Sequence, residues 1–241
     1  MRTNVVYQGD CIQGLKRLPD KSVDLILTDP PYNVSKAEWD IDVLDLLDNC
    51  AKECSRIIKT DGLILWFVPT KYMIQIGNII CKYIPYRWQF IWYMPNRIGG
   101  LASIGFSKYT SVLIFSNAKS VHKNMQDIRV SKWEKMKEHP TPKPKNLIRY
   151  LVKNCSNDND LILDPFMGSG TTALACKQLN RRWVGFEISP EYCKIIQKRL
   201  SQKVITGFFD TQAHSTNGSF NKDLTGNSDE FPQILPLAEL R

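Results

Sequence analysis

The chain has 241 residues, of which 43% are hydrophobic and 23% charged, and this length predicts one α/β domain with an insertion. The longest apolar run, residues 63–68, is too short to cross a bilayer, and residues 1–6 lack a leader pattern, so we expect a cytoplasmic protein with no membrane contact. Seven cysteines without a C-x-x-C pair and three isolated histidines argue against a disulfide framework and predict no metal site.

The formal charge of +8 is unevenly distributed along the chain. Residues 1–81 hold 9 Lys/Arg and 11 Asp/Glu (net −2), residues 82–149 hold 13 and 3 (net +10), and residues 150–241 hold 10 and 10 (net zero). The basic middle third is also rich in Tyr, Trp and Phe. Cations that pair with phosphates and rings that stack on bases favour a nucleic-acid surface. The alternative is a solvated basic surface over an ordinary core.

Apolar patterns predict alternating strands and helices. The expected strands are 5–7, 23–27, 63–68, 88–94, 110–116, 161–163 and 183–186. The expected helices begin after Asp10, near Leu44, Lys71 and Leu147, at Thr172 and at Glu191. Asp61-Gly62 is expected to end the second helix, residues 119–138 to form a surface insertion, and 139–144 to be extended because of their three prolines. Beyond about Lys203 the polar composition predicts a loosely ordered tail.

The stretch Thr28-Asp29-Pro30-Pro31-Tyr32-Asn33 directly follows the second expected strand. Ligands of open α/β sheets bind at the carboxyl ends of the strands. A carboxylate, proline carbonyls not used by a helix, and an aromatic ring suit a planar substrate with an amino group, such as a nucleobase. A simple strand-ending turn is the alternative.

A second stretch, Leu161-Ile162-Leu163-Asp164-Pro165-Phe166-Met167-Gly168-Ser169-Gly170-Thr171-Thr172, joins a buried strand to a helix. Its glycines allow the backbone to approach a ligand closely, and the helix N-terminus offers unpaired N–H groups. Glu187 closes the next strand, where an acidic residue can hold ribose hydroxyls. Without a third glycine or a basic residue in the turn, a nucleoside with a small polar group fits better than a pyrophosphate. Asp10, at the end of the first strand, is either a ligand-binding carboxylate or a helix N-cap.

Together these motifs resemble the amino-group DNA methyltransferases that depend on S-adenosylmethionine. The order D-P-P-Y, basic segment, then glycine turn is similar to the permuted β class, and the likeness extends from about Val6 to Leu200. It includes Gly9-Asp10-Cys11 and the block from His139 through Lys143-Pro144 to Thr172. The resemblance implies a Rossmann-like, doubly wound, mostly parallel sheet of the class I methyltransferase type, with a small basic target-recognition insertion. In this family D-P-P-Y usually goes with adenine N6 and S-P-P-Y with cytosine N4, so Asp29 favours adenine.

The resemblance also implies roles for individual residues. The catalytic group would be Asp29, Pro30, Pro31 and Tyr32. The cofactor site would comprise Asp10, Cys11, Lys143, Asp164, Pro165, Phe166, Gly168, Ser169, Gly170, Thr171, Thr172 and Glu187. Within this set, Glu187 is expected at the ribose, Asp10 near the adenine ring, Lys143 near the methionine carboxylate, and Thr171 and Thr172 at the methionine end.

The expected divisions are a catalytic half at 1–85, a basic target-recognition insertion at 86–138, a cofactor-binding half at 139–203 and a polar tail at 204–241. Double-stranded DNA is the expected partner. Family resemblance adds a homodimer, and a separate restriction endonuclease as a further partner. Three other functions stay open: a cytosine-N4 or RNA adenine methyltransferase, a DNA-binding module regulated by the cofactor, and a nicotinamide oxidoreductase, which would leave D-P-P-Y and the basic segment without a role.

Overall fold

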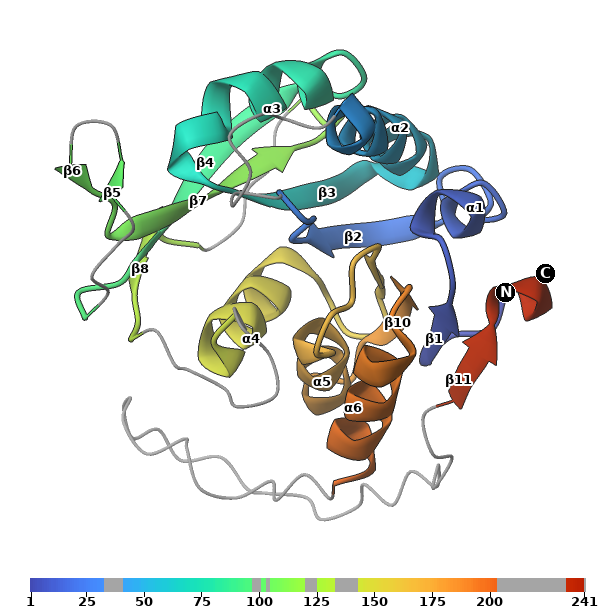
Figure 1. The fold of residues 1–241 in the computed structure, drawn as a ribbon. Coiled ribbons are helices and arrows are strands. Elements are labelled where there is room, and N and C mark those ends of the chain that lie inside the picture. The colour runs from blue at the N-terminus through green and yellow to red at the C-terminus, as the bar shows by residue number, and fades with distance from the viewer. Residues whose placement is uncertain are drawn as a thin grey trace, which may run out of the picture.

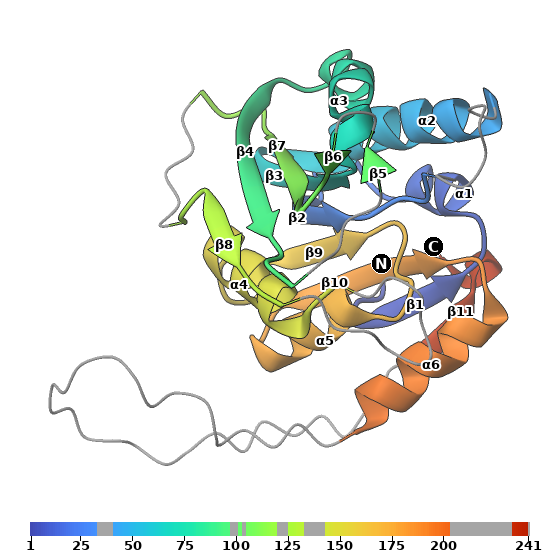
Figure 2. The ribbon, with the colours of Figure 1, turned by 60° about the vertical axis from the view of Figure 1, so that its left-hand side comes forward.

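The fold is a nine-stranded sheet covered by helices on both faces (Figures 1 and 2). It was obtained as a computed structural model, which describes residues 1–32, 41–96, 101–102, 105–119, 125–132, 143–202 and 233–240. Across the sheet the strands are ordered β11-β1-β10-β9-β2-β3-β7-β4-β8. This arrangement confirms the expected doubly wound, mostly parallel α/β architecture.

Five strands form the parallel centre of the sheet: β1 (Val5–Gln8), β2 (Val23–Thr28), β3 (Ile58–Val68), β9 (Leu161–Asp164) and β10 (Arg182–Glu187). The pairings β1–β10, β10–β9, β9–β2 and β2–β3 are all parallel. Strand order changes direction between β9 and β2, because β10 and β1 lie on one side of this pair and β3 on the other. Such a switch point is where open α/β sheets bind their ligands.

The basic middle third contributes strands to the same sheet. β7 (Tyr109–Phe115) is antiparallel to both β3 and β4 (Tyr86–Tyr93), and the short β8 (Ile128–Val130) is parallel to β4. A separate two-stranded sheet pairs β5 (Leu101–Ala102) with β6 (Gly105–Phe106). β4 and β7 thus belong to the main sheet, and their buried side chains to the main core, so the target-recognition insertion expected over 86–138 stays a prediction.

Two apolar layers enclose the sheet, as the alternating inward-facing residues of its strands require. On one face pack α1 (Cys11–Leu15), α2 (Ile41–Ile57), the 3₁₀ turn η1 (Thr70–Tyr72) and α3 (Met73–Cys81). On the other pack α4 (Lys145–Cys155), α5 (Thr171–Gln178) and α6 (Pro190–Ser201) (Figures 1 and 2). No helix among the described residues has the length and apolar composition of a membrane span.

Two local expectations are wrong. Residues Asp61 and Gly62 do not end a helix; α2 ends at Ile57 and β3 begins immediately, because Ile58 already pairs with Val23 of β2. Part of the expected loose tail is also ordered. β11 (Gln233–Pro236) pairs in parallel with β1, and the 3₁₀ turn η2 (Leu237–Glu239) follows it, with Leu237 buried in the core.

Candidate active site

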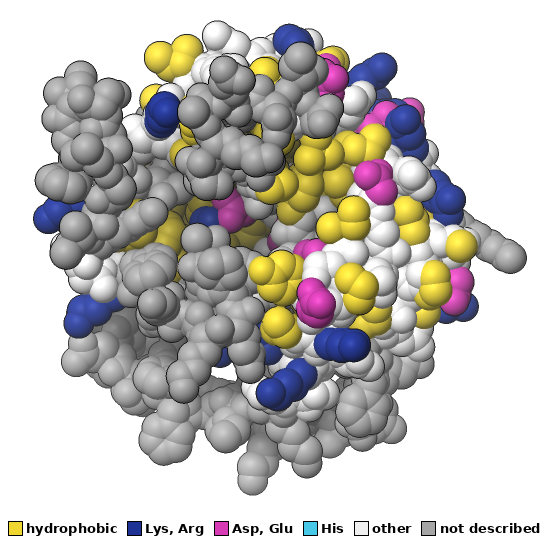
Figure 3. Space-filling view, in the orientation of Figure 1, with side chains coloured by type: hydrophobic (Ala, Val, Ile, Leu, Met, Phe, Trp, Pro, Cys, Tyr) yellow, Lys and Arg dark blue, Asp and Glu magenta, His cyan; other side chains and the backbone are white. Residues whose placement is uncertain are grey.

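A large cavity lies at the carboxyl ends of β2 and β9. These strands are direct neighbours, with Leu25 beside Ile162 and Ile26 beside Leu163. The stretches that follow them, from Asp29 and from Asp164, consequently open into the same space of about 1150 Å³. On the face seen in Figure 3, apolar side chains gather over the middle of the molecule and Lys and Arg lie mainly toward its rim.

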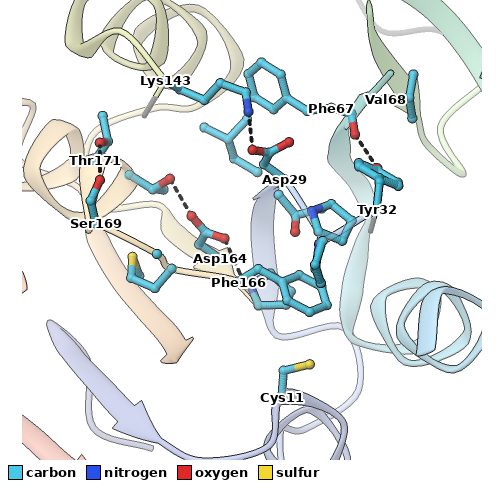
Figure 4. Close-up of a pocket in the computed structure, with 18 of the residues that line it drawn as sticks. Cys11, Asp29, Tyr32, Phe67, Val68, Lys143, Asp164, Phe166, Ser169 and Thr171 are labelled. Atoms are coloured by element: carbon cyan, nitrogen blue, oxygen red, sulfur yellow. Dashed lines mark hydrogen bonds and ion pairs between the residues drawn. The ribbon is translucent and has the colours of Figure 1, made fainter. Parts of the chain in front are cut away.

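Asp29 projects into the cavity from the end of β2 with a partly exposed side chain. Its Oδ2 forms an ion pair with Lys143 Nζ, which also lies 5.1 Å from the centre of the Phe67 ring (Figure 4). Lys143 had been expected near the cofactor's methionine carboxylate, whereas in this structure it contacts the D-P-P-Y carboxylate. Next to Asp29, Pro30 is buried and Pro31 exposed, and among the described residues no N–H donates to the Pro30 carbonyl.

Tyr32 is held rigidly in the cavity wall. Its hydroxyl donates to the carbonyl of Phe67 (Figure 4). It also accepts a hydrogen bond of 2.9 Å from Trp66 Nε1. Only 9% of the residue is exposed, and burial, then the negative charge of Asp29, raises the pKa of its hydroxyl. The phenol therefore stays protonated, and the orientation of its ring is fixed by β3.

Asp164 is the most strongly perturbed carboxyl group of the cavity. Its Oδ2 accepts a hydrogen bond of 2.6 Å from Thr172 Oγ1, and its Oδ1 accepts one of 3.1 Å from Phe166 N. Burial outweighs these bonds and, with further contributions from Asp29 and Glu187, raises the pKa of Asp164 to about 8. Near neutral pH this site can take up a cation by losing its proton.

The glycine turn is joined to the end of β10 by Glu187. One carboxylate oxygen accepts from Gly168 N at 2.7 Å and the other from Ser189 N at 2.9 Å. Burial raises the pKa of Glu187, although these backbone bonds oppose the shift. Gly168 and Gly170 have φ values of +52° and +77°, in the left-handed region that glycine adopts without strain. The sharp turn thus holds the Glu187 carboxylate at the carboxyl end of β10, where it lines the cavity.

Asp10 and Cys11 line the end of the cavity next to β1. Asp10 Oδ1 caps α1 by accepting from Gln13 N at 2.8 Å, which confirms the N-cap interpretation. Asp10 also lines the cavity, and its role as a ligand-binding carboxylate stays a prediction. Cys11 is buried, and burial raises the pKa of its thiol to about 12. The thiol is consequently a neutral apolar wall and not a nucleophile.

All but one of the sixteen residues singled out from the sequence line this cavity. The exception is Gly170, which faces Ile196 of α6 and shapes the turn from behind. His139 and the prolines at 140 and 142 lie outside the described residues. The cavity wall built by β3, including Phe67 and Val68, was not predicted, because their continuous apolar run indicated only a buried strand. Their position at a strand end before Pro69 was the available signal.

Fold and site together define a class I methyltransferase architecture. The family model described as DNA methylase, for N6 and N4 methyltransferases, matches residues 23–198. The chain therefore belongs to the DNA methylase family, as its motifs implied.

Individual relatives agree with this assignment. Type II methyltransferase M.HpaI of Haemophilus parainfluenzae is 31% identical over 81% of this chain and 73% of its own length. DNA adenine methyltransferase YhdJ of Escherichia coli is 28% identical over 81% and 82%.

Solved structures share the fold. The complex of M1.HpyAVI with SAM has a TM-score of 0.64 at 27% identity, covering 81% of this chain and 98% of its own. PvuII DNA methyltransferase, which is cytosine-N4-specific, has a TM-score of 0.70 at 19% identity, covering 87% of each chain.

Proposed function

We propose that this protein transfers a methyl group from S-adenosylmethionine to the N6 amine of adenine in double-stranded DNA. The observation that carries the proposal is the adjacency of two strand ends in one cavity. The end of β2 presents Asp29, and the end of β9 leads into the glycine turn. A reacting amine at the first site and a methyl donor at the second would lie within one connected space.

The composition of the cavity fits this cofactor. Its described lining has four carboxylates, Asp10, Asp29, Asp164 and Glu187, and two ammonium groups, Lys71 and Lys143. The net charge is −2 when all four are ionised and −1 while Asp164 keeps its proton. Either value suits a ligand with a cationic sulfur and amino group, whereas it disfavours a pyrophosphate. This argues against the nicotinamide oxidoreductase. The hydroxyl of Thr28, buried in the lining and without a hydrogen-bond partner among the described residues, is a further polar group that a ligand or water can satisfy.

When bound, S-adenosylmethionine supplies an activated methyl group on a positively charged sulfur. The residues at the end of β2 deal with the acceptor, an aromatic amine whose lone pair is delocalised into its ring. Asp29 and the Pro30 carbonyl accept the two N–H hydrogen bonds, and this directs the nitrogen lone pair toward the glycine turn. Asp29 then stabilises the positive charge that develops on nitrogen until its proton is lost.

Tyr32 is proposed to stack on the target base after it leaves the duplex. Extruding a base costs a few kcal/mol, and stacking on an aromatic side chain returns about 1–3 kcal/mol per base. The bonds from Trp66 and to Phe67 hold the ring in place beforehand, so little side-chain entropy is lost on stacking. Because the Tyr32 ring is largely buried, only the part of it that faces the cavity can stack on the base.

Lys143 is proposed to act at the junction between the two sites. Its ammonium group balances the charge of Asp29 while the cavity holds no base. An incoming amine competes for the same carboxylate, so Lys143 must share Asp29 or turn toward the neighbouring cofactor site. The carboxylate expected there from family resemblance is a suitable new partner.

Methyl transfer to duplex DNA tests the proposal directly. After incubation with labelled S-adenosylmethionine, the DNA is digested and its nucleosides are separated by mass spectrometry. N6-methyl-2′-deoxyadenosine is the expected product. The D-P-P-Y form of the motif supports adenine, as does the name of the relative YhdJ. Labelled N4-methyl-2′-deoxycytidine would instead indicate a cytosine-N4 DNA methyltransferase. Methylation of RNA alone would indicate an RNA adenine methyltransferase.

Variants of matched charge identify the role of Asp29. Asp29→Ala should lower turnover by about 10²–10³-fold, because one preorganised partner of developing charge is removed. Cofactor binding should persist. Asp61→Ala removes a carboxylate from an exposed part of β3 and serves as the control. Turnover of Asp29→Ala equal to that of the control would refute the assignment. Cofactor binding without any turnover in the unaltered protein would instead support the regulated DNA-binding module.

Double-stranded DNA is proposed to contact the basic middle third, consistent with the net charge of +10 over residues 82–149. DNA affinity should fall steeply with salt, since each phosphate contact releases a counterion. An affinity that does not change between low and high salt would exclude this surface. Cytoplasmic location is proposed from the sequence, and a homodimer and a restriction endonuclease partner from family resemblance. Sedimentation of the purified protein tests the dimer.

A further inference from the structure

Helix α6 packs against the glycine turn and contacts its last residues, Ser169, Gly170 and Thr171. Arg199, in the final turn of α6, is buried with 8% exposure. Its Nη1 donates to the carbonyl of Ser169 and lies 3.3 Å from the hydroxyl oxygen of Thr171. One turn earlier, Ile196 packs on Gly170, where an added Cβ would lie 3.0 Å from Ile196 Cγ1. The guanidinium and this contact together fix the backbone of the turn.

The chemistry of the Arg199 contact determines what the Thr171 hydroxyl can do. A guanidinium has only donors, so Thr171 Oγ1 must act as the acceptor in this pair. The hydroxyl hydrogen of Thr171 then points away from Arg199. Ser169 Oγ lies 3.3 Å from Thr171 Oγ1, and both residues line the cavity (Figure 4). The pair therefore offers a hydroxyl donor to a ligand in the cavity.

Thr172, the next residue, cannot replace this donor. Its hydroxyl donates to Asp164 Oδ2 at 2.6 Å and so is already used within the protein. Asp164 is an acceptor when ionised and suits a cationic group. The turn thus separates two kinds of polar contact: a carboxylate for positive charge at Asp164, and a hydroxyl donor for negative charge at the Ser169–Thr171 pair.

We infer that Arg199 is a positioning residue that orients the hydroxyls of Thr171 and Ser169 as donors for the carboxylate of the cofactor's amino-acid end. The inference rests on the proposed function and names the part of the cofactor that α6 helps to recognise. Arg199 does not line the cavity, so it acts through the turn. Its positive charge also makes the Thr171 hydroxyl a stronger donor, since the polar groups form a chain in a buried environment.

The role differs from general support of the fold in one measurable way. General support would affect every ligand of the cavity by the same factor. An oriented donor affects only a ligand that has the carboxylate. The useful comparison is therefore between S-adenosylhomocysteine and its decarboxylated analogue, which keep the same adenine, ribose, thioether and amine.

The test is isothermal titration calorimetry of both ligands with four variants. These are Arg199→Met, Arg199→Lys, Thr171→Val and, as a matched control, Lys198→Met, which removes a positive charge from the exposed side of the same helix turn. The unaltered protein should bind S-adenosylhomocysteine at least about tenfold more tightly than the analogue, as expected for hydrogen bonds to a charged group. Arg199→Met and Thr171→Val should reduce this preference to about threefold or less. Arg199→Lys should retain an intermediate preference, and Lys198→Met the full one.

Binding of the analogue should change by less than about threefold in Arg199→Met. Equal weakening of both ligands in this variant, or an unchanged preference, would overturn the inference. If Arg199→Met does not fold, Thr171→Val provides the test, because this substitution is nearly isosteric and leaves the guanidinium in place. An unchanged preference for S-adenosylhomocysteine in Thr171→Val would also overturn the inference. Failure of the unaltered protein to bind either ligand would instead contradict the proposed function.

Discussion

Replacement of Asp164 by Asn should make the protein more stable at neutral and alkaline pH while weakening its cofactor site. The cause is the buried carboxyl, whose pKa is raised from 3.8 to about 8 by desolvation. In the unfolded chain the group has its ordinary pKa. Between these two values the folded protein retains a proton that the unfolded chain has released, so the free energy of unfolding decreases as pH rises.

The expected size follows from proton linkage. One retained proton corresponds to a slope of about 1.4 kcal/mol per pH unit. The loss begins above about pH 4, accumulates through pH 5–7 and is complete above about pH 8. Asn has no proton to retain, so this slope is absent from the variant. Between pH 5 and 7 the stability of Asp164→Asn relative to the unaltered protein should therefore rise by about 2–3 kcal/mol. Because the variant lacks one acceptor for the Phe166 N–H or the Thr172 hydroxyl, its free energy of unfolding is lower by about 1 kcal/mol at every pH.

Urea unfolding followed by tryptophan fluorescence at pH 5, 6, 7 and 8 measures this difference, because titrations common to both proteins cancel. Thr172→Val is the companion variant. The Thr172 hydroxyl bond lowers the pKa of Asp164, so its removal should raise that pKa and extend the slope to higher pH. Parallel stability profiles for the unaltered protein and Asp164→Asn would refute the argument. Calorimetry in buffers of different ionisation enthalpy should also show a proton released on cofactor binding at pH 6–7, and a smaller release for Asp164→Asn.

Three further substitutions give separate expectations. Gly168→Val should abolish cofactor binding in calorimetry, because its side chain enters the cavity and its φ of +52° is unfavourable for valine; normal affinity would contradict the site. Tyr32→Phe should lower the free energy of unfolding by about 1–3 kcal/mol, since it leaves the buried Trp66 N–H and Phe67 carbonyl without their partner; no loss in urea unfolding would argue against that bond pair. Gly77→Ala, within α3, should stabilise by about 0.5–1 kcal/mol with unchanged turnover, because its Cβ would meet Leu113 at an ordinary 3.5 Å; destabilisation would show that the helix cannot accommodate the methyl group.

The sequence alone determined the architecture and the two motif-bearing strand ends. Apolar runs such as 23–27 and 161–163 are followed directly by residues that stop a strand, and this local pattern does not depend on distant contacts. Parallel strands place their carboxyl ends at one edge, so the meeting of Asp29 and Asp164 could be expected from the chain order and family resemblance. The structure agrees with that expectation through the β2–β9 pairing.

Other features depended on contacts between residues far apart in the chain. Residues 233–240 follow a polar segment that gives no pattern, yet residues 233–236 pair with β1, more than 220 positions earlier in the chain, because the edge of β1 supplies the backbone partners. Lys143 contacts Asp29 because α4 begins beside the end of β2. Arg199 looked like one more cation of an amphipathic helix, and only the packing of α6 behind the turn turns it inward.

Hydrophobic periodicity sets which segments form the sheet, whereas burial and charge at its switch point are set by which strands become neighbours. A carboxyl's pKa, a hydroxyl's donor direction and a lysine's partner are properties of that arrangement and cannot be read from adjacent residues. If the ends of β2 and β9 did not share one space, neither the chemistry at Asp29 nor the role inferred for Arg199 would be possible.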